Sequence, residues 1–307
     1  MGKSRSFPSK RRSKVELLAS FMQKHKELLE QQLRTSVMQM KAPEIIKESM
    51  LYSLEAGGKR IRPMLLFATI DAFGDKVEKG LLTAAAIEMV HTYSLIHDDL
   101  PSMDNDDLRR GRPTNHKVYG DAFAILAGDA LLTYSFQLIA ETAEVGAETK
   151  LKLIRELSVA AGAEGMVGGQ VADISGENRR LTLDELEYIH IHKTGKLLAF
   201  SAVAGALLAG APTAIVEQFR KFAHHLGLAF QIRDDILDLE GNEQKLGKRT
   251  GSDTFNHKST YPALLTMNGA KKALVQEIAK AQGILQETGL NTGLLMELTD
   301  LVANRDH

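Results

Sequence analysis

The stretch HTYSLIHDDLPSMDNDDLRRGRPTNH, residues 91–116, joins the end of an apolar run to five aspartates and three arginines. Apolar side chains before the aspartates recur at three- and four-residue intervals, which indicates a helix. Pro101 favours a helix end just before it, because proline disfavours the α conformation of the preceding residue. The stretch therefore predicts a helix whose carboxyl end carries a dense cluster of opposite charges.

The helical spacing continues through almost the whole chain, whereas short alternating runs typical of strands are scarce. We expect helices at 14–37, 43–56, 61–73, 77–99, 118–143, 147–175, 183–210, 213–239, 260–288 and 292–304. Local signals mark several helix ends: Gly57, Gly58, Gly74, Gly210 with Pro212, and a capping box of Thr182 and Glu185. The sequence therefore predicts an all-α protein.

A single large domain fits the length and composition, because 307 residues with 44% apolar side chains can bury a sizeable core. No Pro- or Ser-rich linker divides the chain, so we expect one domain over residues 14–307. Residues 1–13 carry five Lys and Arg and no long apolar run, which indicates a basic mobile tail rather than a secretory signal.

Composition also limits the classes of partner. The uncharged stretch 197–216 reaches the length of a membrane span, but Gly210 and Pro212 interrupt it, so we expect a packed core helix and no membrane span. The 38 basic and 39 acidic residues nearly cancel, so no overall field favours a nucleic acid. The absence of cysteine excludes disulfides and thiolate metal sites and fits a cytoplasmic protein.

A second aspartate cluster, QIRDDILD at 231–238, follows the first by about 136 residues. Asp234 and Asp238 are four residues apart and share a helix face with Gln231, so their like charges call for a cation above them. A polar loop with basic residues follows each cluster, at 101–117 and at 240–259. The repeated arrangement predicts two walls of one cavity.

Asp98 and Asp104 in the first cluster are six residues apart and would diverge by about 120° on a regular helix. A helix end at Pro101 lets a short loop carry Asp104 back toward Asp98. Carboxylate ligands without His or Cys select hard cations, and magnesium held by one or two carboxylates fits best. Magnesium in turn implies a ligand that carries phosphate.

Basic residues near the clusters fit a diphosphate, because guanidinium and ammonium groups bind phosphate oxygens. They are Lys59, Arg62, Arg109, Arg110, Lys248 and Lys258. His91 lies seven residues before Asp98, two turns away on the same helix face, where it can donate to a second anion. We expect the histidines at positions 190, 192, 224 and 225 to pack or cap rather than to bind metal.

Together these motifs resemble the short-chain trans-polyprenyl diphosphate synthase family. The segment Asp98-Asp99-(four residues)-Asp104 is similar to the family's first aspartate-rich motif in its longer bacterial form, and Asp234-Asp235-(two residues)-Asp238 is similar to the second. The likeness runs in order from GGKRIRP, 57–63, to HKSTYPALL, 257–265. It implies an isoprenoid-synthase-type helical bundle around a deep central cavity, and a homodimer.

The resemblance also implies a role for each matching residue. The clamp for isopentenyl diphosphate matches Lys59, Arg62, His91 and Arg110, and the grip on the allylic diphosphate matches Arg109, Lys193, Lys248 and Lys258. The implied magnesium ligands are Asp98, Asp99, Asp104 and Asp234. Thr194 and Gln231 match groups whose oxygens face a developing carbocation, and Gln170, Asp173, Asp235 and Asp238 match supporting residues.

The implied reaction joins isopentenyl diphosphate to dimethylallyl diphosphate and then to geranyl diphosphate, and it needs no side-chain general base. In the family a bulky residue five positions before the first aspartate closes the pocket, and this position holds Tyr93, which implies a fifteen-carbon product. Helix geometry by itself fits Ser94 equally well as the near wall.

Three alternatives stay open. A synthase with a twenty-carbon product would differ in only a few side chains. A class I terpene cyclase would have a second metal motif of Asn, Ser and Glu and an aromatic-rich cavity, whereas this chain has a second aspartate cluster, no Trp and 6% aromatic residues. A catalytically silent helical partner subunit would have lost an aspartate or a basic clamp, and none is missing.

Overall fold

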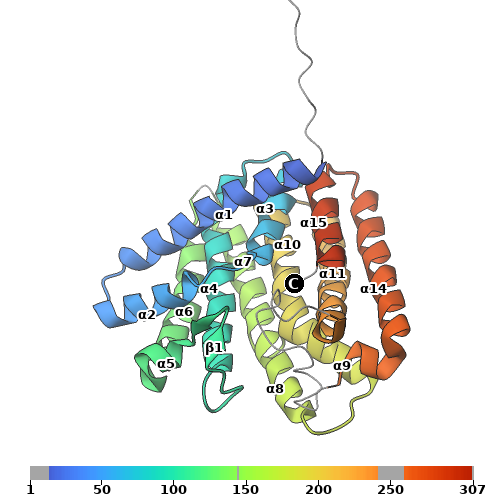
Figure 1. Cartoon of the computed structure of the whole chain (residues 1–307). Coiled ribbons are helices and arrows are strands. Elements are labelled where there is room, and N and C mark those ends of the chain that lie inside the picture. The colour runs from blue at the N-terminus through green and yellow to red at the C-terminus, as the bar shows by residue number, and fades with distance from the viewer. Residues whose placement is uncertain (1–13, 144, 241–258, 306–307) are drawn as a thin grey trace, which may run out of the picture.

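The computed structural model of the chain describes residues 14–143, 145–240 and 259–305, and this part is almost entirely helical (Figure 1). The first half contains α1 (Lys14–Met38), α2 (Glu44–Leu54), α3 (Ile61–Ala72), the short 3₁₀ helix η1 (Val77–Gly80), α4 (Leu81–Asp98), α5 (Asn115–Tyr119) and α6 (Asp121–Glu141). Two short antiparallel strands, β1 (Leu108–Arg109) and β2 (Arg112–Pro113), form a hairpin between α4 and α5. The all-α prediction is confirmed.

The second half contains α7 (Ala147–Ala161), α8 (Met166–Gly176), α9 (Leu183–Ile189), the π-helical segment η2 (His190–Gly195), α10 (Lys196–Leu208), α11 (Thr213–Glu240), α14 (Tyr261–Glu287) and α15 (Gly293–Asn304). The predicted capping box is present, because the Thr182 hydroxyl accepts from the Glu185 backbone N–H and the Glu185 carboxylate accepts from the Thr182 N–H. The predicted stop and restart at Gly210 and Pro212 separates α10 from α11.

Two predicted helices are each interrupted by a non-helical break, and two others, expected at 77–99 and 183–210, change helix type at η1 and η2. The helix expected at 118–143 is broken at Gly120, whose φ of 84° is left-handed, and becomes α5 and α6. The helix expected at 147–175 ends at Ala161 and restarts at Met166, because Gly162 and Gly165 adopt non-helical backbone angles between the two pieces. Helical periodicity continues across both breaks, so the apolar pattern alone could not reveal them.

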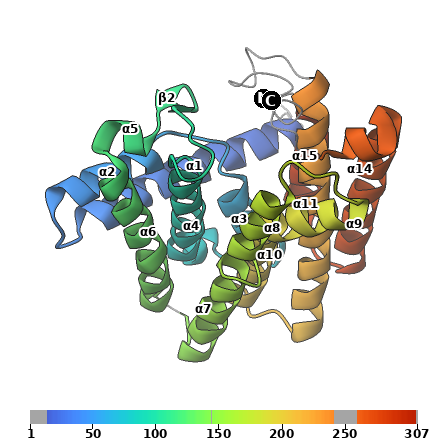
Figure 2. The same ribbon diagram turned by 90° about the horizontal axis from the view of Figure 1, so that it is seen from below.

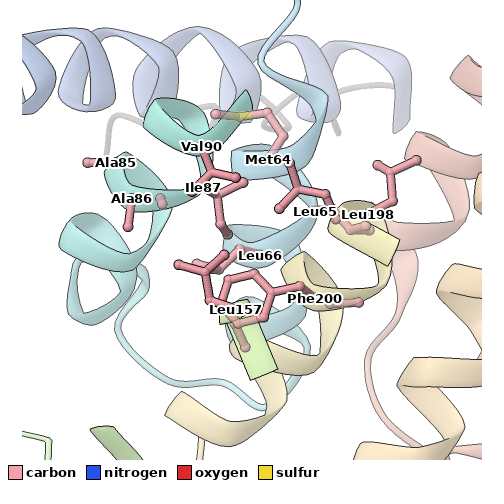
Figure 3. Close-up of a cluster of buried hydrophobic side chains, with 14 of the residues drawn as sticks. Met64, Leu65, Leu66, Ala85, Ala86, Ile87, Val90, Leu157, Leu198 and Phe200 are labelled. Atoms are coloured by element: carbon pink, nitrogen blue, oxygen red, sulfur yellow. The ribbon is translucent and has the colours of Figure 1, made fainter. Parts of the chain in front are cut away.

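The main core surrounds α10, which contacts α3, α4, α7 and α11 and is buried along most of its length. Figure 3 shows its interior, with side chains from α3, α4, α7 and α10 packed against one another. The labelled residues are Met64, Leu65, Leu66, Ala85, Ala86, Ile87, Val90, Leu157, Leu198 and Phe200. A smaller cluster packs α14 and α9 against α11. The expectation that the apolar stretch after residue 197 forms a core helix is therefore confirmed.

By length and composition, one helix among the described residues could cross a membrane, namely α6, and 39% of its most apolar window is buried. A single such helix is weak evidence for a span, because apolar helices of globular proteins pass the same test. Its exposed apolar residues include Phe123, Ile125 and Leu126. These apolar side chains of α6 are therefore exposed to solvent in the single chain.

The packing of α10 against α3 yields a test of the core. An added Cβ at Gly205 would lie 2.7 Å from the Leu66 carbonyl oxygen and 2.7 Å from the Thr69 Cβ, so the helices would have to separate. We predict that Gly205→Ala lowers the free energy of unfolding by about 1–3 kcal/mol. Urea titration would measure it, with Gly283→Ala in α14 as control, where no atom lies within 4 Å and alanine should stabilise the helix by up to about 1 kcal/mol. Equal stability of the two variants would contradict the prediction.

Candidate active site

The first aspartate cluster lies at the carboxyl end of α4. The helix ends at Asp98, Asp99 is its C-cap, and the loop after Pro101 turns back so that the Asp104 backbone N–H donates to the Asp98 carbonyl at 2.9 Å. The return of Asp104 to Asp98, predicted from the proline, is confirmed. Three carboxyl groups of one loop and helix end therefore lie close together.

Asp99 is 2% exposed and is held by Arg109. Arg109 Nε donates to Asp99 Oδ1 at 2.7 Å and to Oδ2 at 2.9 Å, and its Nη2 lies 2.5 Å from Oδ1. Charge-assisted contacts of this kind fix both partners. The contact therefore holds Arg109, a predicted diphosphate ligand, next to Asp99, a predicted metal ligand.

Asp98 carries the clearest electrostatic signal of the cluster. Burial raises the pKa of its carboxyl to about 6, and the negative charges of Asp104 and Asp99 act in the same direction. The positive charges of Lys193 and Arg109 oppose the rise without cancelling it. The ionised carboxylate is therefore disfavoured here, mainly by burial and partly by its acidic neighbours, and a cation would stabilise it.

The loop that carries Arg109 and Arg110 is anchored by polar contacts that the sequence analysis did not single out. The buried Asn115 amide donates to the Ser49 carbonyl at 2.9 Å and to the Ser53 hydroxyl at 2.8 Å, and its oxygen accepts from the Ser49 hydroxyl at 2.9 Å. Every polar atom of this side chain is thus bonded to α2. No local pattern identifies such a contact, because the partners lie more than 60 residues apart.

A cavity of about 650 Å³ opens between the start of α3, the middle of α4 and the end of α15. Four predicted ligands of isopentenyl diphosphate line it: Lys59, Arg62, His91 and Arg110. Within the described part of the chain, the buried Nε of Arg62 has no hydrogen-bond partner, and burial lowers the pKa of this guanidinium. An unsatisfied buried donor of this kind needs an acceptor from a ligand or from water.

His91 faces the same cationic wall. Burial lowers the pKa of its imidazole well below the usual value, and the positive charges of Arg62 and Arg110 lower it further. The ring is therefore neutral near pH 7 and can donate from one nitrogen. The wall lacks negative charge of its own apart from Glu88, so an anion is the complementary occupant.

Arg60 and Glu88 fix this wall from behind. Arg60 has a left-handed φ of 52°, is 4% exposed, forms an ion pair with Glu88 and donates to the Leu54 carbonyl at 2.6 Å. Its neighbours Lys59 and Arg62 are thereby held at the cavity. The sequence analysis missed both residues of this ion pair, because a lone Glu in an apolar helix gives no sign of its partner.

The second aspartate cluster lies near the carboxyl end of α11. Asp234 is half-exposed and forms an ion pair with Arg305 Nη2 at 2.7 Å. Asp235 is buried and accepts from the Tyr261 backbone N–H at 2.8 Å, so it stabilises the start of α14. Asp238 is 2% exposed, whereas Asp234, four residues earlier on the same face of α11, is half-exposed.

Arg305 is a further site residue that the sequence did not reveal. It lines the 650 Å³ cavity, its guanidinium lies 3.8 Å from the centre of the Phe230 ring, and its carbonyl accepts two bonds from Arg233. It therefore links the cationic cavity to the second aspartate cluster. Its position after α15 carries no motif, so only the folded chain shows the contact.

The π-helical segment η2 supplies the other wall. Lys193 Nζ lies 2.7 Å from Asp173 Oδ2 of α8, a contact that the sequence did not indicate. A Cβ added to Gly169 of α8 would lie 2.1 Å from the Lys193 backbone nitrogen, so only glycine allows this approach. A hollow of about 210 Å³ lies between Lys193, Asp173, Gln231 and Asp234. Thr194 is on the same segment as Lys193, and Gln170 is on α8.

The two walls act on each other electrostatically. Lys193 on η2 lowers the pKa of Asp98 on α4, and Asp234 on α11 raises that of Arg62 on α3. Charged groups on opposite sides of the site therefore influence one another. That the two aspartate clusters form the walls of one cavity stays a prediction. Lys248 and Lys258, two further predicted ligands, lie outside the described residues.

Among the described residues, no three His, Asp or Glu side chains converge as a ready-made metal site. Magnesium does not need one, because it is held by one or two carboxylates and completes its shell with water and phosphate oxygens. The all-oxygen donors and the crowded charge at Asp98 fit such an ion. The predicted histidines make other contacts, such as those of His190 with Asp235 and of His225 with Glu277.

The predicted chain-length residues lie on α4, one or more turns before Asp98. Tyr93 is 6% exposed, its ring packs edge-on against His97 with centroids 5.6 Å apart, and burial raises its pKa to about 12. The phenol is therefore un-ionised near pH 7. The Ser94 hydroxyl donates to the His91 carbonyl at 2.9 Å.

A helical cavity with a cationic wall and two carboxylate-bearing helix ends defines a diphosphate-binding protein. The comparison with family models agrees, because the model described as polyprenyl synthetase matches residues 43–289. The chain belongs to the polyprenyl synthetase family.

Individual relatives extend this result. The farnesyl diphosphate synthase of Bacillus subtilis is 56% identical over 94% of this chain and 99% of that protein. The geranylgeranyl diphosphate synthase of Cyanophora paradoxa is 44% identical over 94% of this chain and 97% of that protein. The solved apo structure of an FPP/GFPP synthase from Zymomonas mobilis superposes with a TM-score of 0.83 at 33% identity, over 94% of this chain and 99% of that chain. The predicted family is confirmed.

The raised pKa of Asp98 predicts a pH-dependent effect of Asp98→Asn. Well below pH 3.8 the carboxyl is protonated in both the folded and the unfolded state, so the substitution changes little. Between the ordinary value of 3.8 and about 6 the unfolded chain ionises first, so the wild type loses stability relative to the variant. Above pH 6 we expect Asp98→Asn to be more stable by up to about 3 kcal/mol.

Urea unfolding with a metal chelator, at about pH 4.5 and pH 8, would measure this difference. Asp184→Asn, at an exposed position on α9, is the matched control and should change the free energy of unfolding by the same amount at both pH values. An Asp98→Asn protein that is less stable than wild type at pH 8 would contradict the assignment of Asp98 as a buried, uncompensated charge.

Proposed function

We propose that this chain is a prenyltransferase that adds isopentenyl diphosphate to dimethylallyl diphosphate and then to geranyl diphosphate, with farnesyl diphosphate as product. One pair of observations carries the proposal. The cavity wall holds a buried Arg62 Nε without a hydrogen-bond partner among the described residues, and the same site holds the carboxyl group of Asp98 with a raised pKa. A diphosphate and its cations satisfy both sides at once. The identity to the farnesyl diphosphate synthase of Bacillus subtilis supports the choice of product.

The two substrates are assigned to different parts of the site. Lys59, Arg62, neutral His91 and Arg110 would hold isopentenyl diphosphate in the 650 Å³ cavity, since all four line it. Arg109 and Lys193 would grip the allylic diphosphate, because both act on the pKa of Asp98 and so lie beside the first cluster. Lys248 and Lys258 are assigned to the same grip by the motif alone.

The donor set of Asp98, Asp99, Asp104 and Asp234 would hold magnesium, which supplies charge neutralisation of the leaving diphosphate when bound. Arg109 and Lys193 place fixed positive charge on the same leaving group, and such pre-oriented charge is worth most where water is excluded. The oxygens of Thr194 and Gln231 face the developing allylic cation. The alkene of isopentenyl diphosphate attacks that cation, and the proton leaves to the departing diphosphate.

The supporting residues act through these groups. Asp173 holds Lys193 by the 2.7 Å contact, and Asp235 fixes the start of α14 beside the second cluster. Gln170 is on the same helix as Asp173. Asp238 is buried and follows Asp234 by four residues on α11. We assign all four to positioning rather than to contact with the substrates.

A homodimer in the cytoplasm completes the proposal. The exposed apolar side chains of α6, among them Phe123 and Leu126, would be covered by a second copy of the chain. The absence of cysteine fits the cytoplasm. A dimer interface explains the apolar surface of α6 without a membrane.

The decisive experiment is an assay of the protein with isopentenyl diphosphate, dimethylallyl diphosphate and magnesium, with products separated by chain length. We expect mainly a fifteen-carbon diphosphate, and no product when a chelator removes the metal. A mainly twenty-carbon product would favour the geranylgeranyl alternative. A folded protein without any condensation would favour the silent-subunit alternative.

Tyr93→Ala tests the assignment of product length. Removal of the buried ring would extend the hydrophobic pocket, so we expect at least part of the product to shift to twenty carbons or more. Chromatography of the products would measure the shift, and Tyr93→Phe, which keeps the ring, should leave the fifteen-carbon product dominant. An unchanged product spectrum in a folded Tyr93→Ala variant would remove Tyr93 from this role.

The α6 surface can be tested by sedimentation velocity. We expect a wild-type dimer and at least a tenfold weaker association, about 1.4 kcal/mol, in Leu126→Glu, because a buried unpaired carboxylate is costly at an interface. Val275→Glu on α14 is the control, since Val275 is equally apolar and 67% exposed. A Leu126→Glu protein that dimerises as tightly as the control would exclude this face as the interface.

A further inference from the structure

A second hollow lies on the side of η2 away from Asp173. It has a volume of about 290 Å³ and is formed by α7, η2, α10 and α11, with α7 and α11 on either side of α10 (Figure 2). Its lining shares no residue with the 650 Å³ cavity or with the hollow at Lys193. Small-molecule sites occupy about 300–1,000 Å³, so this hollow lies just below that range and suits a small ligand.

The base of the hollow is apolar. Phe200 and Ala160 are 2% and 6% exposed, and Ile191, Ala199 and Val159 complete the surface. Side chains from three separate helical segments thus form one apolar concavity. An aliphatic group fits this surface, because its burial removes apolar surface of both the ligand and the protein from water.

The charged residues around the apolar base are not balanced. Arg220 is already neutralised, since its Nη1 and Nη2 contact the two Glu156 carboxylate oxygens at 2.9 and 3.1 Å, and its Nε donates at 3.3 Å to Glu217, which lies outside the lining. Lys196 and Lys221 also line the hollow, and neither forms an ion pair with an acidic residue in the part of the chain that the structure describes. Two ammonium groups therefore remain at the rim.

The two histidines at the rim do not reverse this excess. The His225 ring nitrogen contacts Glu277 at 2.6 Å, so this acidic residue already has a partner. Burial lowers the pKa of His224, and the neighbouring His225 and Lys196 lower it as well, so His224 is neutral near pH 7. A neutral imidazole can still donate one hydrogen bond to an anionic oxygen.

We propose that this hollow binds an amphipathic anion, with an aliphatic chain against Phe200 and Ala199 and a phosphate head between Lys196 and Lys221. The chain would gain from burial on the apolar base, and the head would provide the counter-charge that the described residues do not supply. The site is separate from the proposed catalytic cavity and does not depend on the function proposed for it.

The location gives the site a physical connection to the catalytic groups. Ile191 and Gly195 of η2 line the hollow, while Lys193 of the same six-residue π-helical segment contacts Asp173 on the other side. π-helical segments are frequent at functional sites. A ligand in the hollow would therefore rest against the backbone that positions Lys193.

Titration calorimetry with octyl phosphate tests the proposal on the full chain, with magnesium and excess inorganic diphosphate present to fill the catalytic cavity. We expect saturable binding at one site. Lys196→Gln should weaken it at least about tenfold, because a hydrogen bond to a charged group contributes about 1.5–3 kcal/mol. Octanol and inorganic phosphate alone should each bind more weakly than octyl phosphate.

Two further variants make the result decisive. Val159→Glu places a carboxylate at an exposed wall position, so it should weaken octyl phosphate binding without loss of fold. Lys152→Gln, on the same helix but outside the lining, should bind as the wild type does. Binding that is unchanged in both Lys196→Gln and Val159→Glu, or that disappears when diphosphate fills the catalytic cavity, would overturn the proposal.

Discussion

Negative charge at the carboxyl ends of two helices is the constraint on which the rest of the site depends. The backbone of α4 places partial negative charge at its carboxyl end, where Asp98 and Asp99 add two carboxyl groups. Asp234 lies farther from the end of α11, where this effect has faded, but Asp235 and Asp238 add two carboxyl groups close to it. The first cluster is therefore opposed by its own helix and by burial at Asp98, and the second by the like charges within it. Positive groups must surround this region for the chain to fold with its carboxylates ionised.

The structure meets that requirement with cations from several elements. Arg109 binds Asp99, Lys193 of η2 binds Asp173 of α8, and Arg305 binds Asp234 from the end of α15. Their positive charges do not offset the cost of burial at Asp98, whose pKa stays raised to about 6. A positive group is also left without a partner, because the buried Nε of Arg62 has no hydrogen-bond acceptor among the described residues. A site with unmatched charge of both signs is suited to a ligand that brings anions and cations together.

Much of the helical fold could be predicted because helix period and helix ends are local properties. The Thr182 capping box and the proline after Gly210 depend only on neighbours in sequence, and both were identified correctly. The breaks at Gly120 and between Gly162 and Gly165 were missed, because glycine within an apolar periodic run is compatible with either a helix or a turn. Tertiary packing decides between the two. The π-helical segment η2 was missed for the same reason, since its sequence keeps a helical pattern.

The sequence by itself determined the aspartate clusters, the return of Asp104 after Pro101 and the basic residues that accompany them, because spacing and side-chain chemistry are written along the chain. Only the tertiary structure decided that Arg305 reaches Asp234, that Glu88 fixes Arg60, and that Asn115 ties the arginine loop to α2. It also decided that Asp234 is half-exposed while Asp238 is buried. These contacts join residues far apart in sequence, and their energies depend on burial and distance, which no local pattern contains.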